Sequence, residues 1–194
     1  MKDLFLELIN KYLYLFPEEK EKYKEFTEYL NNNNDVTDWN NFNGHVVVGG
    51  FIYAKKEKKF LVIYHNDLKM YLYPGGHIDN TDSNPLEAVK REIKEETGIT
   101  NINEIVLLDN NLIPIDINIH MIPYNERLDL KEHYHYEFRY LFTIDSIQEV
   151  TLDTTESSSF KWIDINELKD NENFGEIVKK FEGIIVYESN YNKR

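Results

Sequence analysis

The sequence lacks several features that mark particular protein classes. It contains no cysteine among 194 residues, which excludes disulfides, thiolate zinc sites, iron-sulfur clusters and a cysteine nucleophile. It is also poor in positive charge, because 22 Lys and Arg stand against 35 Asp and Glu, a formal net charge of -13. Such a charge repels nucleic acid phosphates and anionic membranes. No run of about 18 apolar residues occurs, so no membrane-spanning helix is predicted.

The residues that are present predict a globular protein. The hydrophobic share is 41%, with 14 Tyr, 11 Phe and 2 Trp, which is enough for a packed interior. A length of 194 residues suits one domain with an extension. Asp3 and Glu7 interrupt the apolar start and no basic leader precedes it, so we expect no secretory signal and a cytoplasmic location.

The predicted extension is residues 1–43, and the predicted main domain is residues 44–194. Apolar residues recur at helical spacing on both sides of Pro17, which predicts two short helices over the first 30 residues. The Asn-rich run that follows predicts a loop. We expect these helices to pack on the core as a lid, or to form the contact of a homodimer, in preference to binding substrate directly.

The main domain alternates between strand and helix patterns. Strands are predicted at 45–53, 59–64, 70–73, 105–108, 113–122 and 134–143, and helices at 85–97 and 174–187. Strands with interspersed helices and a long antiparallel stretch predict an α+β fold. We expect an α/β/α sandwich, in which helices flank a mixed sheet, in preference to a doubly wound parallel sheet.

The helix predicted at 85–97 has clear start and stop residues. Asn84 can cap it, Pro85 suits the first helical position, and Glu87 can complete a capping box. Gly98 is placed to end the helix in a left-handed conformation. The buried stripe is expected to comprise Leu86, Val89 and Ile93.

The opposite side of this helix carries three carboxylates. Glu92, Glu95 and Glu96 converge within little more than one turn. A solvated charged face, with Arg91 paired to Glu95 at i+4, is one interpretation. The other is a cation site, because the glycines at 75 and 76 let a backbone carbonyl approach the same place. Hard oxygen ligands of this kind suit Mg²⁺ or Mn²⁺, which in turn hold phosphates.

These residues resemble the Nudix box, which reads Gly, five residues, Glu, seven residues, Arg-Glu, an aliphatic residue, one residue, Glu-Glu, one residue, Gly and an aliphatic residue. The second half fits at every fixed position over Arg91-Glu-Ile-Lys-Glu-Glu-Thr-Gly-Ile99. The first half departs from the pattern by one extra residue. Counting forward from Gly76 places Asp82 at the first glutamate position, and counting back from Arg91 places Ser83 there.

The resemblance covers nearly the whole chain and is to a bacterial Nudix subgroup with a helical N-terminal extension. It implies that Glu92, Glu95 and Glu96, with the Gly75 carbonyl, hold one to three divalent ions, Mg²⁺ or Mn²⁺. It implies that Arg91 orients the glutamates. Members of the family hydrolyse a nucleoside diphosphate linked to another moiety. The general base comes from the box or from a later loop, so our candidates are Glu95 and Glu156, in that order.

The strand predicted at 134–143 alternates sharply and offers further candidates for substrate binding. The side expected to face the core comprises Tyr134, Tyr136, Phe138, Tyr140 and Phe142. The polar side comprises His133, His135, Glu137 and Arg139. The two histidines could bind a metal, could contact phosphate or base, or could lie on a solvated strand face. Arg139 is the better candidate for a phosphate, because a guanidinium matches two oxygens, and His77 and His120 could join the same cleft.

The leading hypothesis is a metal-dependent pyrophosphohydrolase that acts on a small nucleotide-type diphosphate. The alternative is a non-catalytic nucleotide-binding or regulatory module on the same fold, which the missing first glutamate favours. An isoprenoid diphosphate isomerase shares the fold and uses a catalytic cysteine, which this chain lacks. The acidity of the chain argues against nucleic acid as a partner, and no membrane partner is expected.

Overall fold

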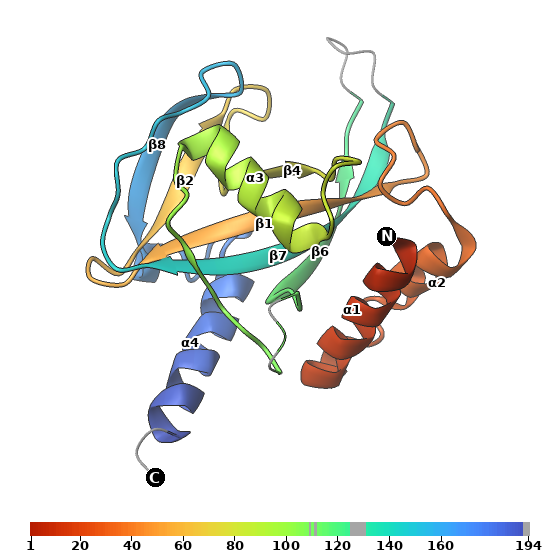
Figure 1. Ribbon diagram of the computed structural model, residues 1–194, viewed down its shortest axis with the longest axis horizontal. Helices are drawn as coiled ribbons and strands as arrows, with labels where there is room; N and C mark the ends of the chain where they lie inside the picture. Colours follow the sequence, from red (N-terminus) through yellow and green to blue (C-terminus); the bar gives the residue numbers. More distant parts are fainter. Residues whose placement is uncertain (109, 111, 125–130, 192–194) are drawn as a thin grey trace.

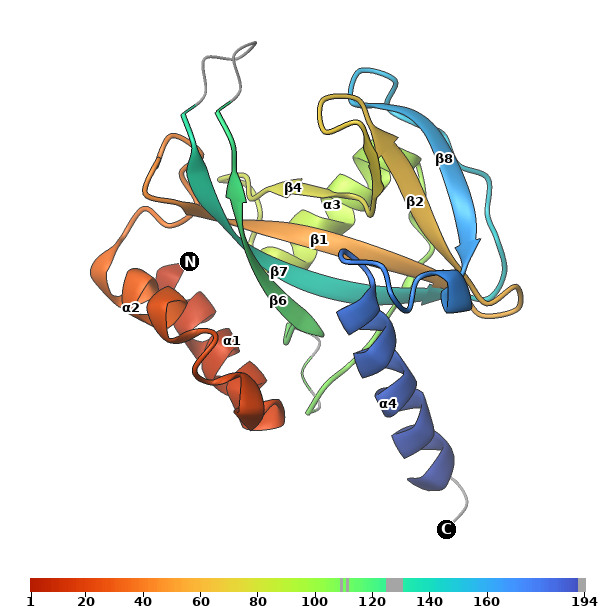
Figure 2. The same cartoon turned by 180° about the vertical axis from the view of Figure 1, so that it is seen from behind.

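A mixed β-sheet with helices on both faces forms the centre of the molecule. The structure is a computed structural model that describes residues 1–108, 110, 112–124 and 131–191. Helix α3 lies in front of the sheet in Figure 1, and helix α4 lies in front of it in the reverse view of Figure 2. Helices α1 and α2 lie side by side at one end of the sheet. None of the described helices combines the length and hydrophobicity that crossing a bilayer requires.

The described elements follow one another along the chain as helices, strands and two short 3-10 helices. The helices are α1 (Lys2–Leu15), η1 (Pro17–Glu19), α2 (Lys24–Asn32), α3 (Pro85–Thr97), η2 (Ile165–Glu167) and α4 (Gly175–Tyr191). The strands are β1 (His45–Ala54), β2 (Lys59–His65), β3 (Met70–Leu72), β4 (Gly75–His77), β5 (Asn103–Glu104), β6 (Asp116–Ile122), β7 (His133–Ile144) and β8 (Ser157–Asp164).

Strands β1 and β7 form the centre of the sheet and run parallel to each other. Their register runs from the pair His45 and His135 to the pair Ala54 and Ile144. The main strand order is β3-β2-β1-β7-β5, and β4, β6 and β8 pair with β1, β7 and β2, respectively. These other pairs are antiparallel. The parallel pair therefore places the first residues of two strands that are distant in sequence at the same end of the sheet.

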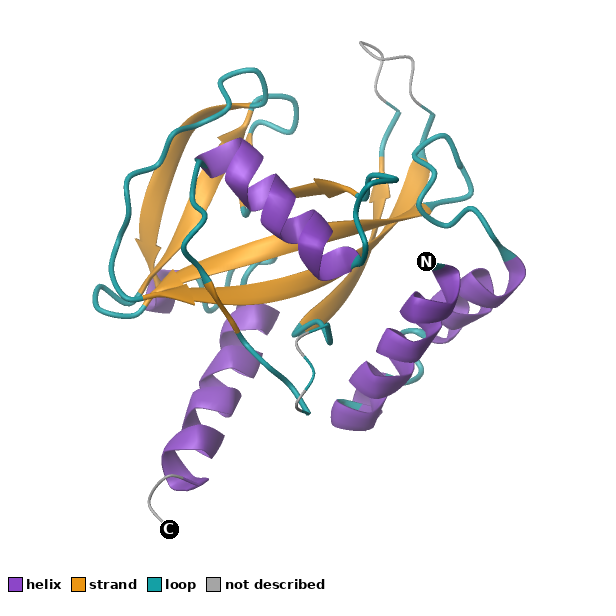
Figure 3. Cartoon of the chain, in the orientation of Figure 1, coloured by secondary structure: helices purple, strands orange, loops and turns teal. Residues whose placement is uncertain are grey.

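The two faces of the sheet carry separate hydrophobic clusters. On one face, α3 approaches β1 closely, and a Cβ on Gly50 would lie 2.7 Å from Cδ1 of Ile93. A glycine is therefore needed at this contact. On the other face, α4 and the residue before it pack on β1, with Phe174 5.3 Å from Phe51 between ring centroids. Figure 3 shows the sheet between these helices, and the predicted α/β/α arrangement is confirmed.

The N-terminal helices pack on the core. The ring of Phe5 in α1 lies 5.1 Å from that of Phe138, and the ring of Phe26 in α2 stacks on Tyr136 at 4.5 Å. These side chains belong to the same hydrophobic cluster as the buried face of α3. The N-terminal helices thus share their core with the main domain, and the boundary after residue 43 and the homodimer contact stay predictions.

Three details of the predicted strands are wrong. The strand expected at 105–108 is absent: β5 is Asn103–Glu104, the Ile105 amide donates one further hydrogen bond, and Leu107 forms only an isolated bridge with Asn110. Leu108 has a φ of 50°, which is incompatible with an extended strand. Tyr134, expected in the core, is 48% exposed. Strand β8 was missed because its Ser-Ser-Ser start has no apolar alternation.

Candidate active site

The ends of α3 match the expectations from sequence. The Asn84 side chain accepts a hydrogen bond from the Glu87 amide at 3.0 Å, and Pro85 occupies the first helical position. Gly98 has a φ of 71°, and its amide donates to the Lys94 carbonyl. The Glu87 carboxylate pairs with Lys90 on the outside of the helix. These local signals fix the rotation of α3 and hence the direction of its glutamates.

Arg91 forms hydrogen bonds to three carboxylates, those of Asp82, Glu92 and Glu95. Its Nη1 donates to Glu92 and to Glu95, both at 2.9 Å. Its Nη2 donates to Asp82 at 2.9 Å, and Nε donates to the same carboxylate. These contacts raise the pKa of Arg91, with the Asp82 hydrogen bond as the largest cause. Of the two candidates for the first glutamate position, Asp82 contacts Arg91, whereas the Ser83 hydroxyl accepts from the neighbouring asparagine.

Glu96 is buried, and Glu92 is partly buried, beside the glycines of β4. The Gly75 amide donates to Oε2 of Glu96 at 2.7 Å, and a Cβ on Gly76 would lie 2.7 Å from Oε1 of Glu92. Burial raises the pKa of Glu96 to about 8, and nearby carboxylates act in the same direction. Burial raises the pKa of Glu92 to about 7, against the opposing charge of Arg91. Both groups therefore favour protonation, or a cation, near neutral pH.

A cavity of about 760 Å³ opens beside Glu96. Most of the predicted site residues line it, namely Gly75, His77, Glu96, His120, His135, Glu137, Arg139 and Glu156. They come from α3, from β4, β6 and β7, and from the loop before β8. The fold therefore brings together residues that are more than 80 positions apart in the sequence.

Arg91, Glu92, Glu95 and His133 do not line this cavity. Glu95 has 55% of its side chain exposed and lines a separate hollow of about 580 Å³ on the outer side of α3, together with Arg91. We call Glu92, Glu95 and Glu96 the glutamate cluster. Glu92 and Glu95 share the Nη1 donor of Arg91, whereas Glu96 lines the cavity. That the three hold one to three divalent ions stays a prediction.

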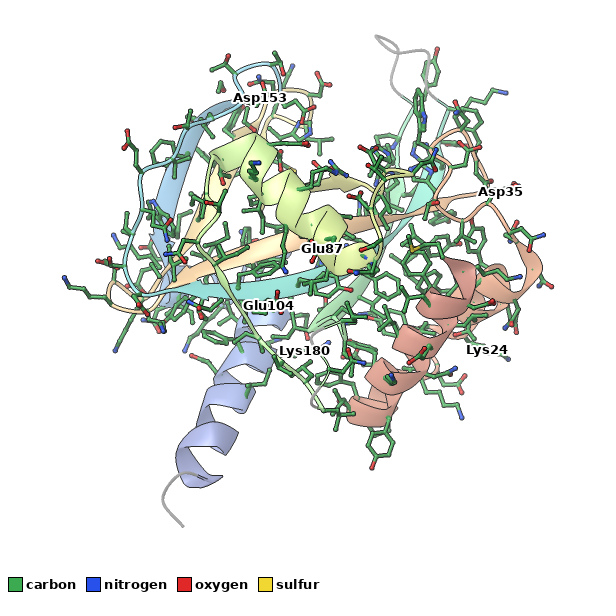
Figure 4. The ribbon with its side chains drawn as sticks, viewed as in Figure 1. Lys24, Asp35, Glu87, Glu104, Asp153 and Lys180 are labelled. Carbon is green, nitrogen blue, oxygen red and sulfur yellow. The ribbon has the colours of Figure 1, made fainter. Side chains whose placement is uncertain are left out.

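The loop before β8 closes one end of the cavity. The Asp153 amide donates to the Glu96 carbonyl at 3.3 Å, and Figure 4 labels Asp153 above the end of α3. Glu156 follows in this loop and is exposed. Its charge contributes to the raised pKa of both Glu92 and Glu96. Glu156 is therefore an exposed carboxylate close to two buried ones.

The polar side of β7 is buried, so the interpretation as a solvated strand face is wrong. The physical reason is that β1 and β6 flank β7 on its two edges, while α4 and the cavity wall cover this side. Nε of Arg139 donates to Glu137 at 2.9 Å, and Nη1 donates to Asp116 at 3.3 Å. The Tyr73 hydroxyl donates to the same Glu137 carboxylate at 2.8 Å. Phosphate binding by Arg139 stays a prediction, and two of its donors already serve carboxylates.

Asp116 links Arg139 to a buried ionic network that sequence reasoning missed. Its Oδ1 accepts from Nζ of Lys180 at 2.6 Å. Lys180 also donates to the Tyr12 hydroxyl and pairs with Glu19, at 2.6 Å and 2.7 Å. Figure 4 labels Lys180 on α4, on the side of the N-terminal helices. The cavity wall is thus connected by charge to both the first and the last helix.

Five histidines meet where β7 begins. We call His45, His77, His120, His133 and His135 the histidine cluster; neighbouring ring centroids lie 4.7 to 5.6 Å apart. Burial lowers the pKa of His45 to about 4 and that of His135 to about 2, and adjacent imidazoles act in the same direction. His45 was missed as a site residue, because the register of a parallel strand pair was its only link to His135.

Residues 44–181 match the NUDIX domain family, which is more than half of the chain. The chain belongs to the NUDIX family. The "Probable DHNTP pyrophosphohydrolase" of Lactococcus lactis subsp. cremoris (strain MG1363) is 39% identical over 97 residues, which cover 50% of this chain and 53% of that protein. The chain therefore spans about half the length of this relative.

Solved structures support the fold. A NUDIX family hydrolase from Clostridium perfringens is 28% identical, with a TM-score of 0.51, over 66% of this chain and 87% of its own. The dihydroneopterin triphosphate pyrophosphohydrolase of E. coli is 18% identical, with a TM-score of 0.52, over 70% and 93%. Both support the NUDIX fold predicted from the sequence. NUDIX proteins act on nucleotide-type diphosphates and generally need a divalent metal. The roles of individual residues in this chain stay predictions.

Proposed function

We propose that this NUDIX protein is a pyrophosphohydrolase that cleaves the diphosphate bond of a nucleoside diphosphate linked to another moiety. The observation that carries the proposal is the burial of Glu92 and Glu96 beside Gly75 and Gly76, at the edge of a cavity of about 760 Å³. A cavity of this size accommodates a nucleotide-sized ligand. Family membership supports the same reaction class.

The residues present fit a divalent cation. Glu96 is 5% exposed and Glu92 is little more, and burial disfavours the charge of both. Carboxylate oxygens are the ligands that Mg²⁺ and Mn²⁺ prefer. We assign the ion to Glu92, Glu95 and Glu96 with the Gly75 carbonyl. A bound divalent ion supplies neutralisation of the diphosphate and lowers the pKa of water.

We assign the general base to Glu156 before Glu95. Glu156 is exposed, lines the cavity and lies near Glu96, so it can reach a water molecule there. Glu95 accepts a hydrogen bond from Arg91 and does not line the cavity, so it has less access to a water molecule there. In this mechanism, Glu156 takes the proton of the water that attacks phosphorus. The bond from that phosphorus to the bridging oxygen breaks, and the second phosphate leaves.

The opposite wall of the cavity suits the rest of the substrate. His77, His120 and His135 line it with ring nitrogens, and Arg139 lies among them in a fixed orientation. The buried guanidinium of Arg139 is held by Glu137, so it does not have to be ordered when the substrate binds. It also contributes positive charge at this wall. We propose that His120 and Arg139 receive the phosphate or base of the substrate.

The test is a panel of nucleoside diphosphate compounds, supplemented with dihydroneopterin triphosphate because a relative carries that name. Each compound is incubated with the full chain and Mg²⁺ or Mn²⁺, and phosphate or pyrophosphate release is measured. We expect turnover of at least one compound and a loss of about 100-fold or more in Glu96→Gln. Glu87→Gln is the matched control, because Glu87 lies on the outside of the same helix.

Three results would count against the hydrolase. Full activity in Glu96→Gln would remove the glutamate cluster from the mechanism. Equal loss in Glu87→Gln would point to a general effect on α3. If no compound is cleaved while one raises the melting temperature, the chain is a nucleotide-binding module on the NUDIX fold.

A further inference from the structure

The histidine cluster concentrates most of the histidines of the chain at one end of the sheet. The sequence has six histidines, and five of them belong to the cluster. His45 begins β1 and His133 begins β7, which is parallel to β1. His77 ends β4 and His120 lies in the later part of β6, and both strands run antiparallel to their neighbours. The topology therefore delivers imidazoles from four strands to the same place.

The ring nitrogens of this cluster converge. Nε2 of His45 lies 3.1 Å from Nε2 of His77, and Nε2 of His133 lies 3.1 Å from Nε2 of His135. One nitrogen from each of His45, His133 and His135 lies within 4.8 Å of the other two. In a tetrahedral site with zinc–nitrogen bonds of about 2.0 to 2.1 Å, neighbouring nitrogens are about 3.4 Å apart. Shifts of the order of an ångström would bring these three nitrogens to that spacing.

The hydrogen bonds of the cluster leave nitrogen lone pairs available. Nδ1 of His133 lies 2.7 Å from the Lys131 carbonyl, which can only accept, so this nitrogen carries the proton. Nε2 of His133 is then the acceptor in its contact with Nε2 of His135, and its lone pair is directed at the cluster. A histidine whose outer nitrogen donates to a backbone carbonyl is the usual arrangement of a metal ligand.

Burial makes the cluster difficult to explain as ordinary polar packing. His45 is 1% exposed and His133 is 3% exposed, and Nδ1 of His45 has no hydrogen-bond partner among the described residues. Protonated imidazoles would repel one another at these distances. A buried ring nitrogen without a hydrogen bond, such as Nδ1 of His45, is unfavourable unless another group, for example a cation, interacts with the ring.

We propose that His45, His133 and His135 bind a first-row transition metal ion, of which Zn²⁺ is the best fit, with His77 as the fourth imidazole. Imidazole ligands select Zn²⁺, Co²⁺ or Ni²⁺ over Mg²⁺, whereas the carboxylates of the glutamate cluster have the opposite preference. The site is structural, because two of its ligands are buried, and it ties the start of β1 to the start of β7. It does not depend on the proposed hydrolase activity.

The test is a titration of the full, untagged chain with Co²⁺ after removal of metal by a chelator. We expect one equivalent to give the strong visible absorption of tetrahedral Co²⁺, which Zn²⁺ abolishes and excess Mg²⁺ leaves unchanged. His133→Gln and His45→Gln should each weaken Zn²⁺ binding by on the order of 100-fold or more. His65→Gln is the matched control, because Nδ1 of His65 accepts from two amides in its own turn, outside the cluster.

The glutamate cluster gives a second control. Glu96→Gln should keep the Co²⁺ spectrum, so a spectrum that disappears in this variant would place the ion on carboxylates and overturn the proposal. Retention of the spectrum in His133→Gln, or a weak octahedral spectrum in the wild type, would overturn it as well. X-ray absorption of the zinc-loaded wild type counts its imidazole ligands directly. A shell of oxygen alone would contradict the site even if the histidine variants fail to fold.

Discussion

Members of the glutamate cluster and of the histidine cluster line the same cavity, but the fold brings the residues of each cluster together in a different way. The glutamates come from one helix within five residues, so helical periodicity alone brings them together. The histidines come from four strands, and strand register brings them together. Burial shifts the two clusters in opposite directions, because it raises the pKa of the acids and lowers that of the bases. One cause thus favours the neutral form of Glu92 and Glu96 in one cluster and of His45 and His135 in the other.

The largest effect is expected from replacing Arg91, which pairs with two members of the glutamate cluster. In Arg91→Gln, the largely buried carboxylates of Asp82 and Glu92 lose their cation. We expect kcat/KM to fall about 100-fold, and the free energy of unfolding to fall by about 3 kcal/mol. Chemical denaturation and the phosphate-release assay measure the two effects. Lys90→Gln, at the next position and on the outside of α3, should cost well under 1 kcal/mol.

The second effect is a pH dependence that has opposite signs for the two clusters. The folded pKa of Glu96, about 8, lies above its ordinary value of 4.5, so the folded state binds more protons and loses stability as pH rises from about 5 to 8. The folded pKa of His45, about 4, lies below its ordinary value of 6.5, so stability is lost as pH falls from 6.5. Each slope is limited to about 1.4 kcal/mol per pH unit for one group.

Urea denaturation in the presence of a chelator, from pH 4.5 to 8.5, checks this expectation. Between pH 4.5 and 6.5 the two slopes oppose each other, so the metal-free chain should be most stable in that range. Glu96→Gln should flatten the alkaline limb above pH 6.5 and uncover the loss of stability below it, whereas His45→Gln should extend the alkaline limb down to about pH 4.5. An alkaline limb that is unchanged in Glu96→Gln would show that burial of this carboxylate does not control it.

A smaller effect should separate function from stability within the glutamate cluster. In Gly76→Ala, the new methyl group would lie 2.7 Å from Oε1 of Glu92, which is the mobile end of its side chain. The carboxylate can move away, so we expect a stability change below about 1 kcal/mol. The displaced carboxylate should lower kcat/KM by about 10-fold. Unchanged kinetics in this variant would mean that the position of Glu92 does not matter for the reaction.

The smallest effect concerns the cap of α3. Asn84→Ala removes the acceptor of the Glu87 amide and should lower the free energy of unfolding by about 1 kcal/mol. The affinity of the histidine cluster for Zn²⁺ should not change, because none of its ligands lies on α3. Thermal denaturation with and without Zn²⁺ would reveal any unexpected coupling as a difference between the two shifts.

Local signals allowed α3 to be predicted to the residue. Its cap, its first proline and its final glycine all lie within or next to the predicted span of 85–97, and the observed helix is Pro85–Thr97. Strand β8 offered no such signal, because β2 and the rest of the sheet impose its extended form on a polar sequence.

The candidate site also contains residues that the sequence revealed and residues that only the structure revealed. The glutamate positions were visible from spacing, whereas His45 became a candidate only when parallel pairing placed it beside His135, 90 positions later. Asp116, one of the two ionic partners of Arg139, was hidden for the same reason. Asp116 lies on the adjoining strand, at the register position opposite Arg139. Contacts that depend on strand register cannot be deduced from the spacing of residues along the sequence.

The ionic network around Asp116 has a consequence for fragments of this protein. The family match starts at residue 44, yet the Tyr12 hydroxyl reaches Lys180 and the Phe5 ring covers Phe138. A fragment limited to residues 44–181 would expose aromatic side chains such as Phe138. It would also leave Lys180 and Asp116 without the Tyr12 hydroxyl. We expect such a fragment to aggregate when expressed alone. We therefore expect the smallest piece that folds by itself to be longer than residues 44–181, the piece that matches the family.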